Sequence, residues 1–205
     1  MLEAVLLLPS DARVVPWKNG RGVTRELALW PAGASFETGD FDWRLSTAPV
    51  DEAGPFSVFP GVERILVVTS GGGLVLSHGA AAPSARLRRL EPYRFPGDWP
   101  TTATLPSGPI TDFNVLLRPE RVDASVQGLV LGARRTRETL AAGHAFLHLV
   151  TGGLSARVTA SEEPFELAAG DSLWQRGLRG GEELDLAGCA RDCEFLLVAL
   201  SADRR

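Results

Sequence analysis

Arginines in line with apolar residues are the first feature of the sequence that could do chemistry. Because residues two apart share one face of a strand, Arg64 lies on the face of Leu66 and Val68. The same alternation puts Arg25 on the apolar face of residues 23–29. A buried guanidinium that lacks a partner destabilises the fold by several kcal/mol. The pattern therefore predicts partners for these cations.

Three arrangements would satisfy such arginines. Native carboxylates, namely Glu26, Glu63 and Asp112, can neutralise them in structural ion pairs. Alternatively, the arginines converge on a cavity where an anionic ligand supplies the missing charge, since a guanidinium grips a carboxylate through two parallel hydrogen bonds. Arginines at strand ends that reach solvent are the simplest arrangement. The sequence leaves all three open.

Two further strands carry polar residues in register. Alternation places Trp43 on one face of its strand and both Arg44 and Ser46 on the other, which is typical of a half-buried strand. Asp112 and Asn114 share a face in a later strand. This polar pair either supports an arginine or is solvated.

Two loops have the composition of stiff turns. Residues 54–61 bracket Phe56 and Phe59 with Pro-Gly pairs, which suits either a loop that lays aromatic rings over a barrel mouth or a plain surface loop. Residues 17–22 hold an Asn-Gly turn between two cations. The glycine spacing there matches no phosphate-binding loop, and a hairpin turn is the better interpretation.

The residue types of metal and nucleophile sites are poorly placed. His144 and His148 would share a strand face about 13 Å apart, and no third ligand accompanies them. Cys189 and Cys193 have the same spacing, which in one strand is too long for a disulfide, so we expect free thiols. No Gly-x-Ser-x-Gly motif occurs. We therefore expect no metal, no cofactor and no covalent catalysis.

The overall charge excludes several classes of partner. The 205 residues include 21 Lys+Arg and 25 Asp+Glu, a formal net charge of −4. This balance argues against nucleic acid or an anionic membrane as the main partner. The apolar N-terminal run, residues 2–9, has no basic start and is shorter than the ~20 residues of a membrane span. We therefore expect a cytoplasmic protein, and a monomer and a homodimer both stay open.

The spacing of turn residues predicts an all-β fold with little helix. Glycine (22 residues) and proline (14) are spread along the chain and divide it into short apolar runs. Residues 64–77 contain an apolar run, a glycine-rich turn and a second run, which we interpret as a hairpin. Residues 144–158 repeat this pattern, and each repeat is followed by a Gly-Asp turn. The repetition predicts two small barrels in tandem.

Four motifs, in order, resemble the HutD/Ves family. They are Trp17-Lys18-Asn19-Gly20-x-Gly22-x-Thr24-x-Glu26, Phe41-Asp42-Trp43-Arg44-Leu45-Ser46, Gly54-Pro55-Phe56-Ser57-x-Phe59-Pro60-Gly61-x-x-Arg64 and Asp112-Phe113-Asn114. The second half of the chain resembles that family mainly through its cupin-like pattern. The resemblance implies a bicupin, with two jelly-roll (RmlC-like) β-barrels in one chain. We place the N-terminal barrel at residues 1–120 and the C-terminal barrel at residues 121–205.

The resemblance also implies a role connected with histidine utilisation. It points to a metal-free protein that binds a small, amino-acid-derived carboxylate such as formylglutamate and acts as a regulator or metabolite sensor. Carried over residue by residue, the expected ligand contacts are Lys18, Asn19, Arg44, Ser46 and Arg64. The expected aromatic walls and orienting groups are Trp43, Phe56, Phe59, Asp112 and Asn114.

One departure concerns the wider cupin superfamily. Metal-binding cupins place a His-x-His pair and a glutamate at the start of the barrel core. Here the corresponding positions read Glu63-Arg64-Ile65 and His144-Ala145-Phe146. The metal chemistry of those cupins therefore does not transfer to this chain.

Two other functional classes stay open beside the sensor. A metal-independent isomerase or lyase could use Asp112 or Glu26 as base while Arg64 holds a small carboxylate. A protein-interaction module would instead expose the tryptophan and phenylalanine residues of the motifs as an apolar patch. Burial of Trp43 distinguishes this last hypothesis from the other two.

Overall fold

The described part of the chain is built almost entirely from strands. The computed structural model describes residues 2–17, 22–158, 163–189 and 191–202. These residues form nineteen strands and one 3-10 turn, η1 (Pro9–Asp11). Among them, no helix has the length and apolarity needed to cross a bilayer. The predicted all-β fold is confirmed, and Arg135–Thr139 form strand β13.

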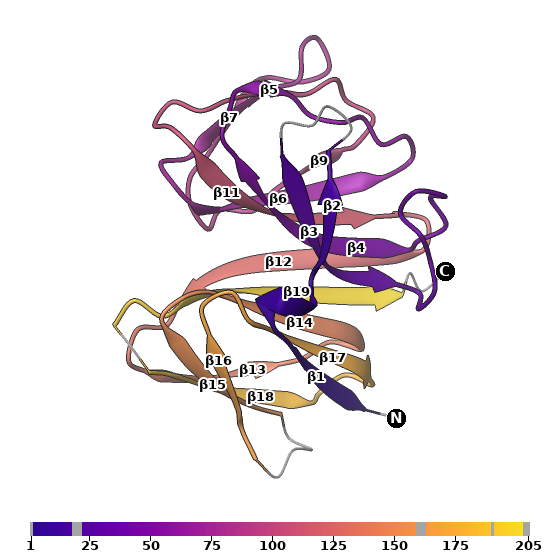
Figure 1. Cartoon of the computed structure of the whole chain (residues 1–205). Helices are drawn as coiled ribbons and strands as arrows, with labels where there is room; N and C mark the ends of the chain where they lie inside the picture. The colour runs from indigo at the N-terminus through magenta and orange to yellow at the C-terminus, as the bar shows by residue number, and fades with distance from the viewer. Residues whose placement is uncertain (1, 18–21, 159–162, 190, 203–205) are drawn as a thin grey trace. The chain divides into compact units, whose positions relative to one another are not determined.

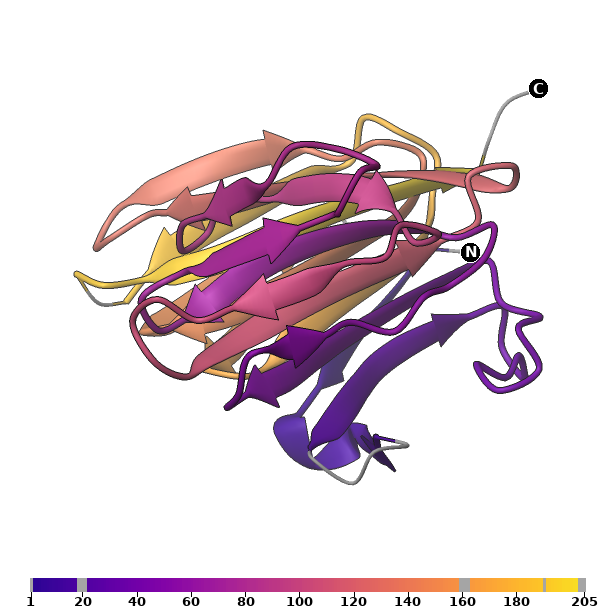
Figure 2. The same cartoon turned by 90° about the horizontal axis from the view of Figure 1, so that it is seen from above.

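Residues 12–122 form one compact unit, which we call the first barrel. Its strands are β2 (Arg13–Pro16), β3 (Val23–Trp30), β4 (Trp43–Val50), β5 (Gly54–Pro55), β6 (Glu63–Ser70), β7 (Leu74–Ser77), β8 (Ala85–Leu87), β9 (Tyr93–Pro96), β10 (Thr102–Thr104) and β11 (Ile110–Leu117). They make a six-stranded sheet in the order β2-β3-β4-β11-β6-β9 and a four-stranded sheet in the order β5-β10-β7-β8. Figure 2 shows β2 and β3, in indigo, at one edge of the larger sheet.

Residues 1–11 and 123–205 form the second unit, which we call the second barrel. Its strands are β1 (Glu3–Leu7), β12 (Val122–Val130), β13, β14 (Gly143–Thr151), β15 (Gly153–Val158), β16 (Phe165–Ala168), β17 (Ser172–Leu178), β18 (Glu183–Gly188) and β19 (Glu194–Ala202). They form a sheet in the order β1-β17-β14-β19-β12 and a second sheet in the order β13-β18-β15-β16 (Figure 1).

The two barrels repeat one strand topology. In the first, β6 pairs with β9 and β11, β11 pairs with β4, and β7 pairs with β8 and β10. In the second, β14 pairs with β17 and β19, β19 lies next to β12, and β15 pairs with β16 and β18. Strands β4 to β11 therefore correspond one by one to β12 to β19, as expected of an internal duplication.

The glycine-rich turns do not close hairpins, as the sequence pattern had suggested. Strands β6 and β7, like β14 and β15, belong to different sheets of their barrel. The turns instead carry the chain from one sheet to the other. Glycine is required for this crossing, because Gly73 has a φ of +99° and a Cβ there would lie 2.7 Å from the carbonyl oxygen of Leu87.

The N-terminal strand pairs far along the sequence. Although we had placed residues 1–120 together, β1 pairs antiparallel with β17 over its whole length. Arg176 of β17 reinforces this pairing, since its Nε and Nη2 donate hydrogen bonds to the Glu3 carboxylate at 2.9 and 2.6 Å. A five-residue strand contains no signal that specifies which sheet edge it will join.

Candidate functional site

The inner face of the larger sheet of the first barrel brings together the predicted polar residues. Leu116 of β11 pairs with Arg44 of β4 on one side and with Arg64 of β6 on the other. The two arginines therefore stand in one row, two strands apart, with about 10 Å between their Cα atoms. Asn114 lies in the next row, opposite Ser46, and Asp112 lies one row further on.

The guanidinium group of Arg44 is fixed by a carboxylate at its Nε edge and by an aromatic ring against one of its faces. Its Nε donates a hydrogen bond of 2.7 Å to Glu26 Oε2, and its guanidinium lies 3.9 Å from the centre of the Phe36 ring. Burial lowers the pKa of Arg44, and the Glu26 carboxylate opposes that shift. Only 4% of Arg44 is exposed. Its two Nη atoms make no hydrogen bond with the described residues.

Arg64 is held in the same manner by different groups. Its Nε donates to Asn114 Oδ1 at 2.8 Å, Nη2 donates to the same oxygen, and the guanidinium lies 4.4 Å from the centre of the Phe56 ring. Burial lowers the pKa of Arg64 to about 10. Its Nη1 makes no hydrogen bond within the described chain. Each arginine thus keeps terminal N–H groups for a further acceptor.

Asp112 completes a hydrogen-bonded chain. The amide nitrogen of Asn114 donates to Asp112 Oδ1 at 2.7 Å. Because Arg64 can only donate, the amide oxygen of Asn114 must face it and the amide nitrogen must face Asp112. Burial raises the pKa of Asp112 to about 6, against the opposing effects of the Arg64 charge and of hydrogen bonds from Asn114 and the Ala48 backbone. This carboxyl group therefore titrates close to neutral pH.

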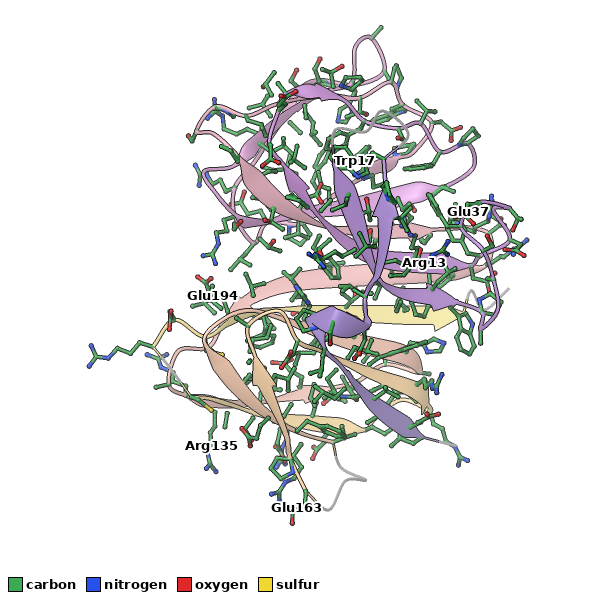
Figure 3. The ribbon with its side chains drawn as sticks, in the orientation of Figure 1. Arg13, Trp17, Glu37, Arg135, Glu163 and Glu194 are labelled. Atoms are coloured by element: carbon green, nitrogen blue, oxygen red, sulfur yellow. The ribbon has the colours of Figure 1, made fainter. Side chains whose placement is uncertain are left out.

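Loops supply the aromatic rings that cover the two arginines. Phe36 lies between β3 and β4, and Phe56 directly follows β5. The Phe36 loop is tied to β2 by an ion pair between Arg13 Nη2 and Glu37 Oε1 at 2.9 Å; Figure 3 labels both residues. Phe59 packs edge-on against Phe36, with ring centres 5.6 Å apart.

One predicted contact lies on another face of the sheet, and two fall outside the described residues. Lys18 and Asn19 lie outside the described residues. Trp43 points to the opposite face of β4 from Arg44, is 1% exposed, and stacks on Trp30 with ring centres 6.4 Å apart. Trp43 is therefore not a wall beside Arg44, and its burial also removes it from the exposed patch of the interaction-module hypothesis.

The predicted faces of β3 were wrong. Arg25 is exposed, whereas Glu26 is buried. The register between β3 and β4 shifts between Glu26 and Ala28. The irregularity breaks the period-2 alternation on which our assignment of Arg25 to an apolar face depended. Glu63 likewise pairs with Arg94 rather than with Arg64.

Phe36 is the contact that the sequence analysis missed. Its loop has no motif like the Pro-Gly brackets of residues 54–61, and its role follows only from its position over Arg44. Glu26 was foreseen as an ion-pair partner, and the structure pairs it with Arg44.

A divalent cation does not fit among these side chains. The row nearest the barrel end presents two guanidinium groups, and its neighbours offer a serine and an amide. His148 is buried, its Nδ1 lies 2.9 Å from Ser172 Oγ, and burial lowers its pKa to about 4. Among the described residues, no three His, Cys, Asp or Glu side chains gather as a metal site. Cys189 and Cys193 are free thiols in the connection between β18 and β19, so our assumption of one strand was wrong.

The fold is that of a bicupin. Two bicupins resemble the chain at low sequence identity, the Escherichia coli pirin YhhW in complex with nickel(II) and the Lactobacillus farciminis oxalate decarboxylase formate complex. The pirin is 11% identical with a TM-score of 0.63, covering 96% of this chain and 98% of its own. The oxalate decarboxylase is 9% identical with a TM-score of 0.65, covering 97% of this chain and 88% of its own. At these identities the likeness concerns the fold alone. The predicted bicupin architecture is confirmed.

The chain belongs to the HutD family, whose model matches residues 9–191. Protein Ves of Citrobacter koseri is 40% identical over 121 residues, which are 57% of this chain and 61% of Ves. The chain thus spans about three fifths of the length of that curated relative. A conserved protein of unknown function, PA5104 of Pseudomonas aeruginosa PAO1, is 34% identical with a TM-score of 0.85, covering 97% of this chain and 99% of its own. HutD of Pseudomonas fluorescens SBW25, determined in a formate condition, is 30% identical with a TM-score of 0.78, covering 98% and 99%.

Proposed function

We propose that the first barrel binds a small, amino-acid-derived carboxylate on Arg44 and Arg64, as a regulator or sensor connected with histidine utilisation. The observation that carries the proposal is the pair of buried guanidinium groups. In each guanidinium group, Nε donates a hydrogen bond to a neighbouring side chain and one face lies against a phenylalanine ring. Terminal N–H groups of both arginines nevertheless have no acceptor in the described chain. Such fixed donors lose little conformational entropy when an anion binds.

The charge of the surrounding groups supports an anionic ligand. Glu26 pairs with Arg44 through Nε alone, so its ion pair does not occupy the outer edge of the guanidinium. Asp112, with a pKa of about 6, can take up a proton when a second negative charge approaches Arg64. Proton uptake by Asp112 would leave the barrel interior nearly neutral with a carboxylate bound.

Two comparisons give further support. Membership of the HutD family supports the connection with histidine utilisation, and HutD of Pseudomonas fluorescens, determined in a formate condition, supports a small carboxylate as the ligand class. A formylglutamate-like molecule combines a formyl group with carboxylates and is the ligand we consider first.

Calorimetric titration with formylglutamate, urocanate, histidine and formate tests the proposal. We expect at least one carboxylate to bind, and Arg44→Ala to weaken that binding by about 2 to 4 kcal/mol through loss of a charge-assisted fork. Arg44→Lys retains the charge that Glu26 requires but loses the planar fork, so it also weakens binding while the fold survives.

Arg25→Ala is the matched control, because Arg25 is an exposed arginine on the neighbouring strand β3. Its affinity should equal that of the unaltered protein. The absence of heat with all four compounds, for a protein that melts cooperatively, would refute the carboxylate proposal. Equal affinity in the Arg44 and Arg25 variants would show that Arg44 is not the cation that binds the ligand.

A metal-independent isomerase or lyase is the second candidate function. The observation that favours it is Asp112, a buried carboxyl group that titrates near neutral pH and is linked to Arg64 through Asn114. If this candidate is right, Asp112→Asn abolishes turnover of a bound carboxylate while calorimetry still detects binding. Binding without turnover in the unaltered protein supports the sensor.

A further inference from the structure

The second barrel contains a row of residues equivalent to the row of Arg64. Arg64 lies six residues before Ser70, the last residue of β6, and Ala145 lies six residues before Thr151, the last residue of β14. Both strands have a register shift at the same place near these ends. Ala145 therefore occupies the position of Arg64.

Small side chains dominate this second row. Ala145 pairs with Gln175 of β17 and with Ala199 of β19, and Gln175 pairs in turn with Ala4 of β1. The next row toward the barrel centre consists of four leucines, Leu6, Leu173, Leu147 and Leu197. Three positions in the row of Gln175 are therefore alanines, whereas every position in the neighbouring row is a leucine. Ala4 and Ala199, at its outer ends, are partly exposed.

Gln175 is buried in this row without a hydrogen-bond partner. It leaves the sheet on the same face as Leu173, and it is 1% exposed. Its Oε1 has no donor, and the described residues make no hydrogen bond to either end of its amide. A buried amide left in this state destabilises a protein, because it has given up its hydrogen bonds to water. A leucine at this position would avoid the cost. We therefore expect that the amide of Gln175 forms hydrogen bonds with a molecule that is not part of the chain.

The surroundings of Gln175 determine which partner fits. The hydrophobic residues that pack around Ala145 include Leu147, Leu173 and Leu197. Among the described residues of the second barrel, no arginine, lysine or glutamate is buried, and the one buried aspartate, Asp171, lies in the turn between β16 and β17. An ion there would lose its hydration without gaining a counter-charge. The nearest charged residues of β1 and β17, Glu3 and Arg176, are paired with each other on the other face.

We propose that the row Ala4, Gln175, Ala145 and Ala199 is a second ligand site, for a small uncharged molecule with a donor and an acceptor side by side. A primary amide or a protonated carboxylic acid has this arrangement and can form two parallel hydrogen bonds with the Gln175 amide. The second barrel would then bind a neutral ligand at the position where the first barrel has two cations. This inference concerns other residues than the proposed carboxylate site, so the two can fail separately.

Side-chain amide NMR of the full-length, 15N-labelled protein tests this site. The chain has only two glutamines, Gln127 and Gln175, and two asparagines, so their NH2 signals are readily assigned with single variants. Titration with acetamide should shift the Gln175 NH2 signals in a saturable manner. Acetate, which is charged, and N,N-dimethylacetamide, which lacks a donor, should bind at least tenfold more weakly.

Variants separate a ligand site from a structural amide. Gln175→Leu should weaken acetamide binding at least tenfold. Because this variant has no Gln175 NH2 signal, binding is measured through the backbone amide signals of β17. The same variant should have a higher melting temperature than the unaltered protein. Ala145→Leu should also weaken binding because it fills the row; if it does not fold, Ala199→Leu fills the partly exposed end instead. Gln127→Leu, at an exposed position of β12, is the matched control and should bind as the unaltered protein does.

Two results would overturn the inference. In the unaltered protein, Gln175 signals that do not respond to acetamide, or that respond equally to N,N-dimethylacetamide, would mean that the amide recognises no such ligand. Equal acetamide affinity in the Gln175→Leu and Gln127→Leu variants would mean that the ligand binds elsewhere. Neither result depends on carboxylate binding by the first barrel.

Discussion

Arg44 and Arg64 obtain similar geometry from different partners. A carboxylate, Glu26, holds the first, and a neutral amide, Asn114, holds the second. The charge that balances Arg64 lies one residue further along the hydrogen-bonded chain, on Asp112, which can be protonated. The charge beside Arg64 therefore depends on pH through the protonation of Asp112.

The titration of Asp112 predicts how stability depends on pH. Its folded-state pKa of about 6 lies above the ordinary value of 3.8, so the folded protein holds this proton more tightly than the unfolded chain does. The resulting stabilisation is fully present below about pH 4 and is lost as pH rises through about 6. Relative to Asp112→Asn, the unaltered protein should lose about 2 kcal/mol of unfolding free energy between pH 4 and pH 7. Urea denaturation across this range measures the difference, and a difference that is constant or grows with pH would contradict the prediction.

Sequence alone predicted part of the site. Period-2 alternation placed Arg64 on the face of Leu66 and Val68 and placed Asp112 and Asn114 on one shared face, and both assignments agree with the pairing of β6 and β11. Whether the Asp112–Asn114 pair faces the interior or solvent was left open by the sequence. Alternation failed for Arg25 and Glu26, since the register shift in β3 has no signature in residue type. Phe36 could not be foreseen either, because a loop ring reaches Arg44 only through tertiary packing.

At the scale of elements, the connections between the sheets of each barrel are tightly constrained. Gly71 and Gly73 in the first barrel and Gly152 in the second all have a positive φ and closely approach backbone atoms. The sequence correctly marked these glycines as turns. It could not tell a hairpin from a crossing, because both require the same turn residues and differ only in which strands they join.

Replacing a crossing glycine should cost more than replacing a glycine in open space. Gly73→Ala would strain the backbone and place its Cβ 2.7 Å from the Leu87 carbonyl oxygen. Gly79 also has a positive φ, +60°, but no atom lies within 4 Å of the corresponding Cβ, so Gly79→Ala is the matched control. We expect the control to lose about 1 kcal/mol and Gly73→Ala to lose about 2 kcal/mol more. If thermal or urea unfolding showed the same loss of unfolding free energy for both variants, the contact between the Cβ added by Gly73→Ala and the Leu87 carbonyl oxygen would not destabilise the protein.

At the scale of the whole molecule, duplication supplied two equivalent barrels with different interiors. Among the described residues, the inner face of the larger sheet of the first barrel has the ionisable groups Arg44, Arg64, Glu26 and Asp112, whereas the equivalent row of the second barrel has alanines and the neutral amide of Gln175. The repeated turns predicted the duplication. The pairing of β1 with the second barrel could not be predicted, because its partner strand β17 lies in the other half of the sequence.

Deleting residues 2–8 tests the contribution of β1 to the second barrel. Leu2, Ala4 and Leu6 pack on the apolar core of that barrel, so their loss should reduce its stability by about 3 kcal/mol. Amide protons of β17 that face β1 should exchange faster with solvent. Amides of β9, the corresponding strand of the first barrel, are the internal control. Unchanged exchange in β17 would show that β1 contributes little.

The pairing of β1 with β17 also imposes an order on synthesis. Glu3 and Arg176, which join the two strands, are 173 residues apart. A ribosome extends the chain from its N-terminus, so residues 12–122 emerge completely while β1 still has no partner. The first barrel can therefore close during translation, whereas β1 remains an unpaired strand until β17 has left the exit tunnel.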